Sequence, residues 1–289
     1  MQKNTFLSSV FYFDSGIKKM GNNFQAKTEA EREFKKVFET INYAKNRYEV
    51  FCDWLLCSAL SFSQVCHFNK NREKRYLEIV KKYSKEDLQK FAELLAITTE
   101  AFMIGNAPYF QDFLGNIYMI CGFGSSTQGQ FFTPYSVCQA MAQMQGIPEK
   151  NKIITVMDCA VGGGALPIAY AEHLFNNDIN YQRNMLLHAT DVSINSCSMC
   201  MVQCSLLGIP AIIVHGNSLT LETWEVWETP MVGINLVTER LEAQKRNGVQ
   251  KITTEKIIEN TSRNKEIIKN TSQNEVKKII ESKQLEFSF

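Results

Sequence analysis

The sequence predicts an α/β protein with an N-terminal helical domain followed by a Rossmann-like core, and three observations predict this class. Apolar residues recur at helical spacing through residues 29–120. An apolar run from Ile153 to Met157 then ends in Asp158 and a glycine-rich turn that opens a helix. In the stretch 184–215 a helical segment separates two strand-like segments, and this alternation favours a parallel sheet.

Composition limits the class of protein. The chain has 289 residues, enough for one large domain or two modest ones, and 45% of them are hydrophobic. Its formal net charge of +1 excludes a global field that would attract nucleic acid, so any basic surface has to be local. Nine cysteines without a secretory start indicate reduced thiols in a cytoplasmic protein. No apolar run reaches the ~18 residues of a membrane span, so no membrane association is expected.

The chain is expected to divide into four regions: a lead-in over 1–28, a helical domain over 29–120, the core over 121–238 and a charged low-complexity tail over 239–289. Thr28 and Glu31 have the spacing of a capping box at the first helix. The segment 70–75 is basic, and a solvated helix start is favoured there over a phosphate-contacting patch.

The segment 156–165 combines the end of a strand, an acid, three consecutive glycines and a helix start. Glycines let the backbone approach a ligand closely, and a helix N-terminus offers free N–H groups. The second predicted strand, 184–192, contains Asp191 near its tip, where a Rossmann-like fold binds ribose hydroxyls. The pattern therefore indicates a nucleotide-type cradle, although a turn that only packs the helix on its strand is the alternative.

A loop rich in small polar residues, 124–134, precedes the core and ends in Thr-Pro. Thr133 is expected to cap the helix over 135–145, with Pro134 in its first turn.

Together these stretches resemble N6-adenine DNA methyltransferases like the modification subunit of type I restriction systems. The resemblance rests on Gln130-Phe131-Phe132-Thr133-Pro134, the 158–164 loop, Asp191 and Gly216-Asn217-Ser218-Leu219, with a weaker helical lead-in over 112–118. It implies S-adenosylmethionine as cofactor and DNA as partner. It also implies that the cofactor-binding residues are Gln130, Phe131, Phe132, Thr133, Pro134, Asp158, Ala160, Gly162, Gly164, Asp191 and Asn217.

The chain departs from the family in its fourth motif, an Asn-Pro-Pro-aromatic tetrapeptide that holds the flipped adenine. The expected fourth strand, 231–234, is followed by Asn235, which fits the asparagine position and is the one catalytic candidate. The two prolines and the aromatic residue are missing there. Asn106-Ala107-Pro108-Tyr109 looks faintly like such a tetrapeptide, but an ordinary loop is favoured.

Few residues follow this region, so the methyltransferase core is expected to be incomplete and to leave an exposed sheet edge. A partner subunit, a second copy or the N-terminal helices are the candidates to cover it. Two functions remain open. One is methylation of adenine N6 in DNA, with the fourth motif degenerate or supplied in trans. The other is a catalytically inactive accessory protein that binds the cofactor within a mobile-element or replication complex.

Three cysteines at helical spacing, Cys197, Cys200 and Cys204, are expected to pack in the core rather than to bind metal, and no metal site is predicted. The tail ends in a short apolar pattern that resembles the glutamine-led peptides bound by the bacterial sliding clamp. Its candidate contacts are Gln284, Leu285, Phe287 and Phe289. The alternative is that this peptide folds back onto the exposed sheet edge or the helical domain.

Overall fold

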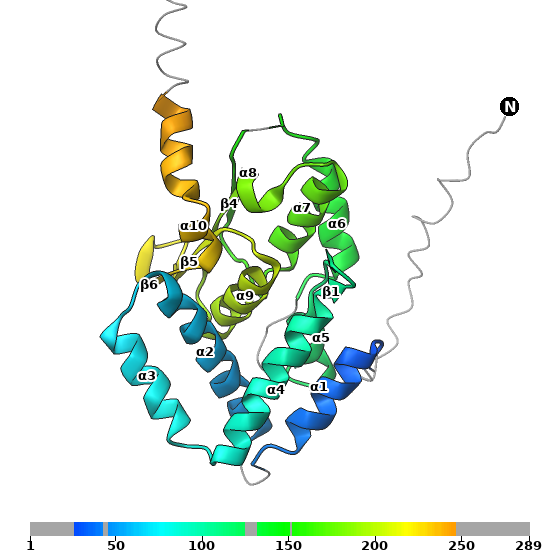
Figure 1. Cartoon of the computed structure of the whole chain (residues 1–289), viewed down its shortest axis with the longest axis vertical. Coiled ribbons are helices and arrows are strands. Elements are labelled where there is room, and N and C mark those ends of the chain that lie inside the picture. Colours follow the sequence, from blue (N-terminus) through cyan, green and yellow to red (C-terminus); the bar gives the residue numbers. More distant parts are fainter. Residues whose placement is uncertain (1–25, 43–45, 125–131, 151, 247–289) are drawn as a thin grey trace, which may run out of the picture.

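The computed structural model describes residues 26–42, 46–124, 132–150 and 152–246 (Figure 1). Five helices form the N-terminal part: α1 (Glu29–Glu39), α2 (Arg47–Cys66), α3 (Lys70–Val80), α4 (Lys85–Ala101) and α5 (Phe113–Ile120). Between α4 and α5 the chain makes a small antiparallel hairpin of β1 (Met103–Ile104) and β2 (Ala107–Pro108). The favoured loop at Asn106 is therefore the turn of this hairpin.

The first helix begins where the sequence predicts. The Glu31 N–H donates to Thr28 Oγ1 at 3.2 Å, and the Thr28 N–H donates to Glu31 Oε2 at 3.0 Å. This reciprocal pair satisfies two backbone donors that a helix start otherwise leaves without partners. The apolar side of α1 then buries Phe34 and Phe38 in a cluster of aromatic rings.

The second part of the chain builds the sheet. Its elements are α6 (Tyr135–Met144), β3 (Ile154–Asp158), α7 (Ala165–Asn176), α8 (Tyr181–Asn184), β4 (Met185–Asp191), α9 (Ile194–Leu207), β5 (Ala211–Asn217), β6 (Glu222–Glu228) and α10 (Pro230–Ile234). The strand order is β3-β4-β5-β6, in which β3, β4 and β5 are parallel and β6 is antiparallel to β5. The predicted α/β class with a helical N-terminal part is confirmed.

The helix α9 lies at the centre of the molecule, between the sheet and α2 (Figure 1). Because the crossovers from β3 to β4 and from β4 to β5 run in the same direction, right-handed connections place α7 and α9 on the same face. Cys197, Cys200 and Cys204 on α9 are all fully buried there, as core packing predicts. One continuous hydrophobic cluster joins the helical part to this face of the sheet.

The expected fourth strand is wrong, because residues 231–234 lie in α10. The strand that follows β5 is instead β6, which carries the strand-favouring residues Thr223, Trp224 and Val226. A tight turn over 218–221 reverses the chain between β5 and β6, with Leu221 at a φ of 61°. Asn217 supports this turn, since its Oδ1 accepts hydrogen bonds from the Leu219 and Thr220 N–H groups.

The sheet ends at β3 on one side and at β6 on the other, and no further described strand pairs with either. Gln244, in the helical segment 237–246, covers the start of the β3 edge. The Ile153 N–H donates to Gln244 Oε1 at 2.8 Å, and Gln244 Nε2 donates to the Ile153 carbonyl at 3.1 Å. Farther along the strand, the Met157 side chain is 81% exposed on one face of the sheet. The sequence predicts an edge at the fourth strand, and β6 is the fourth and last described strand of the sheet, while β3 forms its other edge.

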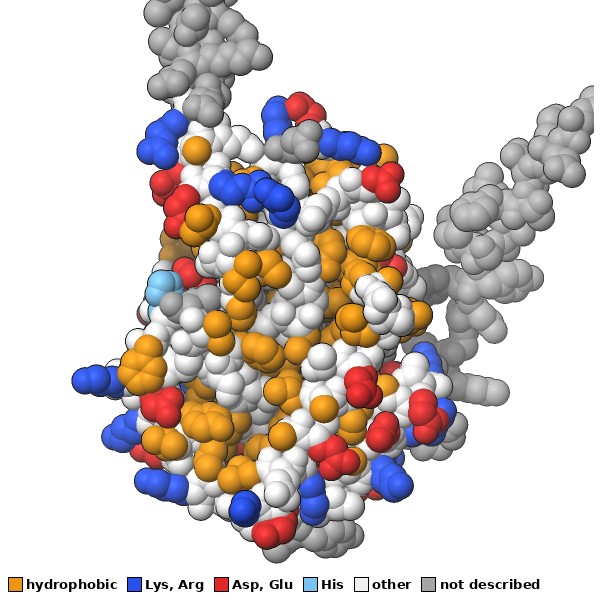
Figure 2. Space-filling model, viewed as in Figure 1, with side chains coloured by type: hydrophobic (Ala, Val, Ile, Leu, Met, Phe, Trp, Pro, Cys, Tyr) orange, Lys and Arg blue, Asp and Glu red, His pale blue; other side chains and the backbone are white. Residues whose placement is uncertain are grey.

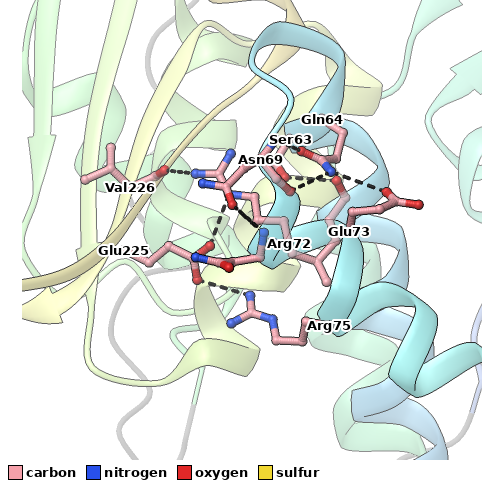
Figure 3. Close-up of polar contacts among 10 residues, drawn as sticks. Ser63, Gln64, Asn69, Arg72, Glu73, Arg75, Glu225 and Val226 are labelled. Carbon is pink, nitrogen blue, oxygen red and sulfur yellow. Dashed lines mark hydrogen bonds and ion pairs between the residues drawn. The ribbon is translucent and has the colours of Figure 1, made fainter.

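Helix α3 binds the opposite edge of the sheet through two arginines (Figure 3). Arg72 Nε lies 3.1 Å from Glu225 Oε1, Arg75 Nη2 lies 3.1 Å from Glu225 Oε2, and Arg72 also donates to the Val226 carbonyl. The Arg72 side chain is only 12% exposed. The interpretation of 70–75 as a solvated helix start is therefore wrong for these two residues, which connect the helical part to β6.

Surface charge is mixed on the face drawn in Figure 2, where hydrophobic side chains gather over the middle and charges of both signs lie mostly around the rim. This face offers no broad basic surface to a nucleic-acid backbone. Within the described ranges, no helix is long and apolar enough to cross a membrane.

Candidate functional site

The carboxyl ends of the three parallel strands lie side by side, and open α/β sheets bind their ligands at these strand ends. The loop over 159–164 follows β3, and residues 192 and 193 follow β4. Asp158, Asp191 and Asn217 are the last residues of β3, β4 and β5. The structure thus brings together the acids and the glycine loop that the sequence predicts as a cradle.

The glycine loop has a defined shape. The Val161 N–H donates to the Thr190 carbonyl at 3.1 Å, and the Gly164 N–H donates to the Val161 carbonyl at 3.0 Å. Gly164 has a φ of 99°, and a Cβ added there would lie 3.4 Å from Cys200 Cα. Only glycine fits this position without strain, because the backbone is left-handed and passes close to α9.

The loop also leaves backbone donors available. Gly164 is the N-cap of α7 and provides no side-chain cap. Among the described residues, the N–H groups of Gly163, Ala165 and Leu166 have no hydrogen-bond partner. Unpaired donors at a glycine loop and a helix start suit an anionic or strongly polar ligand group.

Asp191 fixes the loop to the tip of β4. Its Oδ2 accepts from the Gly162 N–H at 2.9 Å, and its Oδ1 accepts from the Ser193 N–H at 2.8 Å. Asp158 accepts from the Ala160 N–H at 3.1 Å. Burial raises the pKa of Asp158, and the nearby Asp191 raises it further, although the bond from Ala160 acts in the opposite direction.

Residues 132–134, which lead into α6, lie beside the glycine loop. The Phe132 ring lies against Gly162, where an added Cβ would come within 3.2 Å of it, and packs edge-on against Tyr118. Tyr135 Oη and Gln139 Nε2 of α6 both donate to Glu172 of α7, at 2.8 and 2.9 Å, and hold the lead-in near α7.

The details of this lead-in differ from the prediction. Pro134, not Thr133, occupies the N-cap of α6, and no side chain caps that helix. Thr133 is exposed. The predicted contacts of Gln130 and Phe131 lie outside the described residues.

A buried polar network behind the loop is the feature that sequence reasoning missed. Gln203 Nε2 of α9 donates to the Gly163 carbonyl at 2.7 Å and to Asp112 Oδ1 at 2.9 Å. Gln203 Oε1 accepts from the Leu114 N–H at 3.0 Å. A single glutamine in an otherwise apolar and small-residue stretch of α9 was the available signal.

Asn235 is not brought to this site. It is the C-cap of α10, and its Nδ2 donates to the Gln182 carbonyl at 2.6 Å, next to the amino end of β4. The physical reason is the direction of β6. Because β6 runs antiparallel to β5 and Glu228 pairs with Ile212, the residues that follow emerge at the amino ends of the strands.

The fold and site define a Rossmann-like protein with a glycine loop between two acidic strand ends. The family model for N-6 DNA methylases matches residues 110–279, and the chain belongs to this family. The membership confirms the predicted family and S-adenosylmethionine as the cofactor of the class.

Several solved structures are similar to the chain, including two methyltransferases. One is a class I S-adenosylmethionine-dependent methyltransferase of Listeria monocytogenes, with 14% identity and a TM-score of 0.37, which matches 67% of this chain and 55% of that protein. The other is a type I restriction-modification methyltransferase subunit of Streptococcus thermophilus, with 15% identity and a TM-score of 0.37, which matches 68% of this chain and 59% of that protein. The chain thus spans little more than half of either protein. Among curated protein sequences, none matches it.

Proposed function

We propose that the chain binds S-adenosylmethionine at the carboxyl ends of β3 and β4. The observation that carries this proposal is the pairing of Asp191 with Gly162, at 2.9 Å, beside N–H groups at the start of α7 that have no partner among the described residues. Each carboxylate oxygen accepts one backbone bond and keeps capacity for another, so Asp191 can also accept from ribose hydroxyls. Phe132 would contact the methionine part, and Asn217 the adenine ring.

The proposed methyl acceptor is adenine N6 in DNA, which the family membership supports. Adenine has to leave the duplex for this reaction, at a cost of a few kcal/mol, and needs a stacking surface in the enzyme. In the part of the chain described after β5, no Asn-Pro-Pro-aromatic segment lies at the carboxyl edge. We therefore expect the chain alone to transfer methyl groups very slowly or not at all.

The second candidate function is that of an accessory protein that binds the cofactor without catalysis, and the position of Asn235 at the opposite end of the sheet favours it. A methyl-transfer assay with labelled cofactor and unmethylated DNA tests whether the chain alone is an enzyme. Cofactor binding with little or no label in DNA agrees with the accessory function and with a fourth motif supplied in trans, and label that appears only when a partner subunit is added distinguishes the second of these. Rapid labelling of DNA by homogeneous protein would contradict our reading of the fourth motif.

A partner is proposed for the open edge of β3, because unpaired strand edges readily pair with another chain. Light scattering distinguishes the partners: a dimer supports a second copy, and a monomer at all concentrations excludes it and leaves a different subunit. The predicted clamp-binding segment lies outside the described residues. Fluorescence anisotropy with a purified bacterial sliding clamp tests this segment. A peptide of residues 280–289 should bind the clamp, and its Gln284→Ala, Phe289→Ala variant should not.

A further inference from the structure

We infer that Asp112 and Gln203 are positioning residues that set the shape of the glycine loop from behind. The ligand named in this inference rests on the proposed function, but the effect on the loop does not. The two residues come from different parts of the fold: Asp112 caps α5 in the helical part, and Gln203 lies in α9, within the sheet part. Both are buried, with exposures of 4% and 0%.

The orientation of the Gln203 amide is determined by its partners. Its nitrogen faces two acceptors, the Gly163 carbonyl and Asp112 Oδ1, while its oxygen faces one donor, the Leu114 N–H. If the amide were flipped, its NH₂ group would face the Leu114 N–H, and its oxygen would face the Gly163 carbonyl and Asp112 Oδ1. The side chain therefore has one satisfied orientation, and that orientation holds the Gly163 carbonyl toward the interior.

Fixing the Gly163 carbonyl matters because its neighbours on both sides are left-handed, Gly162 at a φ of 55° and Gly164 at 99°. Such a run of glycines has many accessible conformations when no partner selects one. Gln203 selects the conformation in which the Gly162 N–H donates to Asp191 and the Gly163 N–H has no partner among the described residues. The buried amide thereby keeps ligand-facing donors in place before a ligand arrives.

Asp112 in turn fixes Gln203. Its Oδ1 accepts from Gln203 Nε2 and from the Gly115 N–H at 3.1 Å. Its Oδ2 side lies against Gly115, where any Cβ would collide with the carboxyl group. Burial raises the pKa of Asp112, while the two hydrogen bonds oppose this rise. A misaligned polar group at this depth would be left without a hydrogen-bond partner, so the network favours one arrangement.

The helical part therefore contributes to the site without touching the ligand. Through Asp112 and the Leu114 N–H, α5 contacts Gln203, and Gln203 contacts the loop. This route explains why the lead-in over 112–118 accompanies the loop motifs in this chain.

The test uses three variants of the full chain and one control. Gln203→Leu keeps the volume and removes all three bonds. Asp112→Ser keeps a good N-cap for α5 but is too short to reach Gln203. Asp112→Asn keeps an oxygen acceptor in the same place and should rescue the loss. The control is Asp53→Ala, which removes another buried acid. Asp53 accepts hydrogen bonds from Tyr83 and Lys82, which lie between α3 and α4 and not at the glycine loop.

Hydrogen exchange of the Gly162 and Gly164 amides without ligand is the first measurement. We expect Gln203→Leu and Asp112→Ser to speed this exchange roughly tenfold or more, the effect of losing about 1.4 kcal/mol or more of protection. Asp53→Ala should not speed the exchange of these two amides by more than its effect on global stability explains. Unchanged loop exchange in both variants, or an equal increase in Asp53→Ala, would overturn the inference.

Affinity for S-adenosylmethionine, measured by calorimetry, is the second measurement. We expect a loss of roughly tenfold to a hundredfold in Gln203→Leu and Asp112→Ser, most of which Asp112→Asn restores. Equal losses in Asp112→Asn and Asp112→Ser would contradict the role of the oxygen acceptor. If the unmutated chain does not bind the cofactor, the proposed function fails, and loop exchange alone decides the inference.

Discussion

The carboxyl ends and the amino ends of the three parallel strands hold similar residue types but use them differently. At the carboxyl ends, Asp191 fixes a loop in which the Gly163 N–H has no partner among the described residues. At the amino ends, Asn184 and Asn235 direct their amide groups to the carbonyls of Lys152 and Gln182, at 3.0 and 2.6 Å. These amides fasten the chain to itself. Strand direction, and not residue type, therefore decides which polar residues form the site.

The amino ends also have a hollow, a cleft of about 590 Å³ between the β1–β2 hairpin and α8. It is lined by Asn106 and Pro108 of the hairpin together with Phe175, Asn180 and Gln182. The faint tetrapeptide at 106–109 therefore lies beside α8, at the opposite end of the strands from the glycine loop. This position agrees with the interpretation of that stretch as an ordinary turn.

The largest expected effect at the carboxyl ends comes from Gly164→Ala. The substitution combines a left-handed backbone with a close approach to Cys200, and we expect it to cost roughly 2–4 kcal/mol of unfolding free energy. The matched control is Gly146→Ala, which also has a positive φ, 72°, but open space around its Cβ. The control should cost only about 1 kcal/mol. Equal costs in urea unfolding would show that the contact with α9 does not matter.

A middle effect is expected at β6, the strand that turns the chain back to the amino ends. Burial alone would raise the pKa of Glu225, but the Trp227 indole and the guanidinium groups of Arg75 and Arg72 outweigh it and lower the pKa. A lowered carboxyl pKa adds stability that is complete above the ordinary value of 4.5 and is lost as the pH falls through the lowered value.

Glu225→Gln should therefore cost about 1–3 kcal/mol at pH 7, and the difference from the unmutated chain should shrink below pH 4.5. Glu222→Gln, on the same strand but exposed, is the control and should change little. Urea unfolding at a series of pH values measures both variants. A difference that does not depend on pH would contradict the role of the Arg72 and Arg75 contacts.

The smallest effect is expected for Asn235→Ala at the amino ends. Loss of its bond to the Gln182 carbonyl should cost about 0.5–1.5 kcal/mol of stability. Cofactor affinity should stay the same, because the residue lies at the wrong end of the strands. A cofactor affinity that falls tenfold while the fold remains intact would mean that the two ends are not separate.

Local signals made much of the fold and site predictable. The apolar runs before Asp158 and Asp191 predict two strands, and the glycines between them predict a tight loop. Each of these signals lies within a few consecutive residues. The role of Gln203 could not be predicted, since it depends on meeting Asp112, which lies 91 positions earlier. The direction of β6 depends on a turn in which Leu221 adopts a left-handed φ. Leucine rarely adopts this conformation, so no signal in the sequence indicated the turn. That turn carried Asn235 away from the site.

Calorimetry with the purified chain measures whether S-adenosylmethionine binds at the carboxyl ends of β3 and β4. We expect the unmutated chain and Asn235→Ala to bind it with equal affinity. Asp191→Ala should bind it roughly 5- to 150-fold more weakly, because about 1–3 kcal/mol is lost with the carboxylate. No binding by the unmutated chain, or equal binding by Asp191→Ala, would contradict a cofactor site at these strand ends.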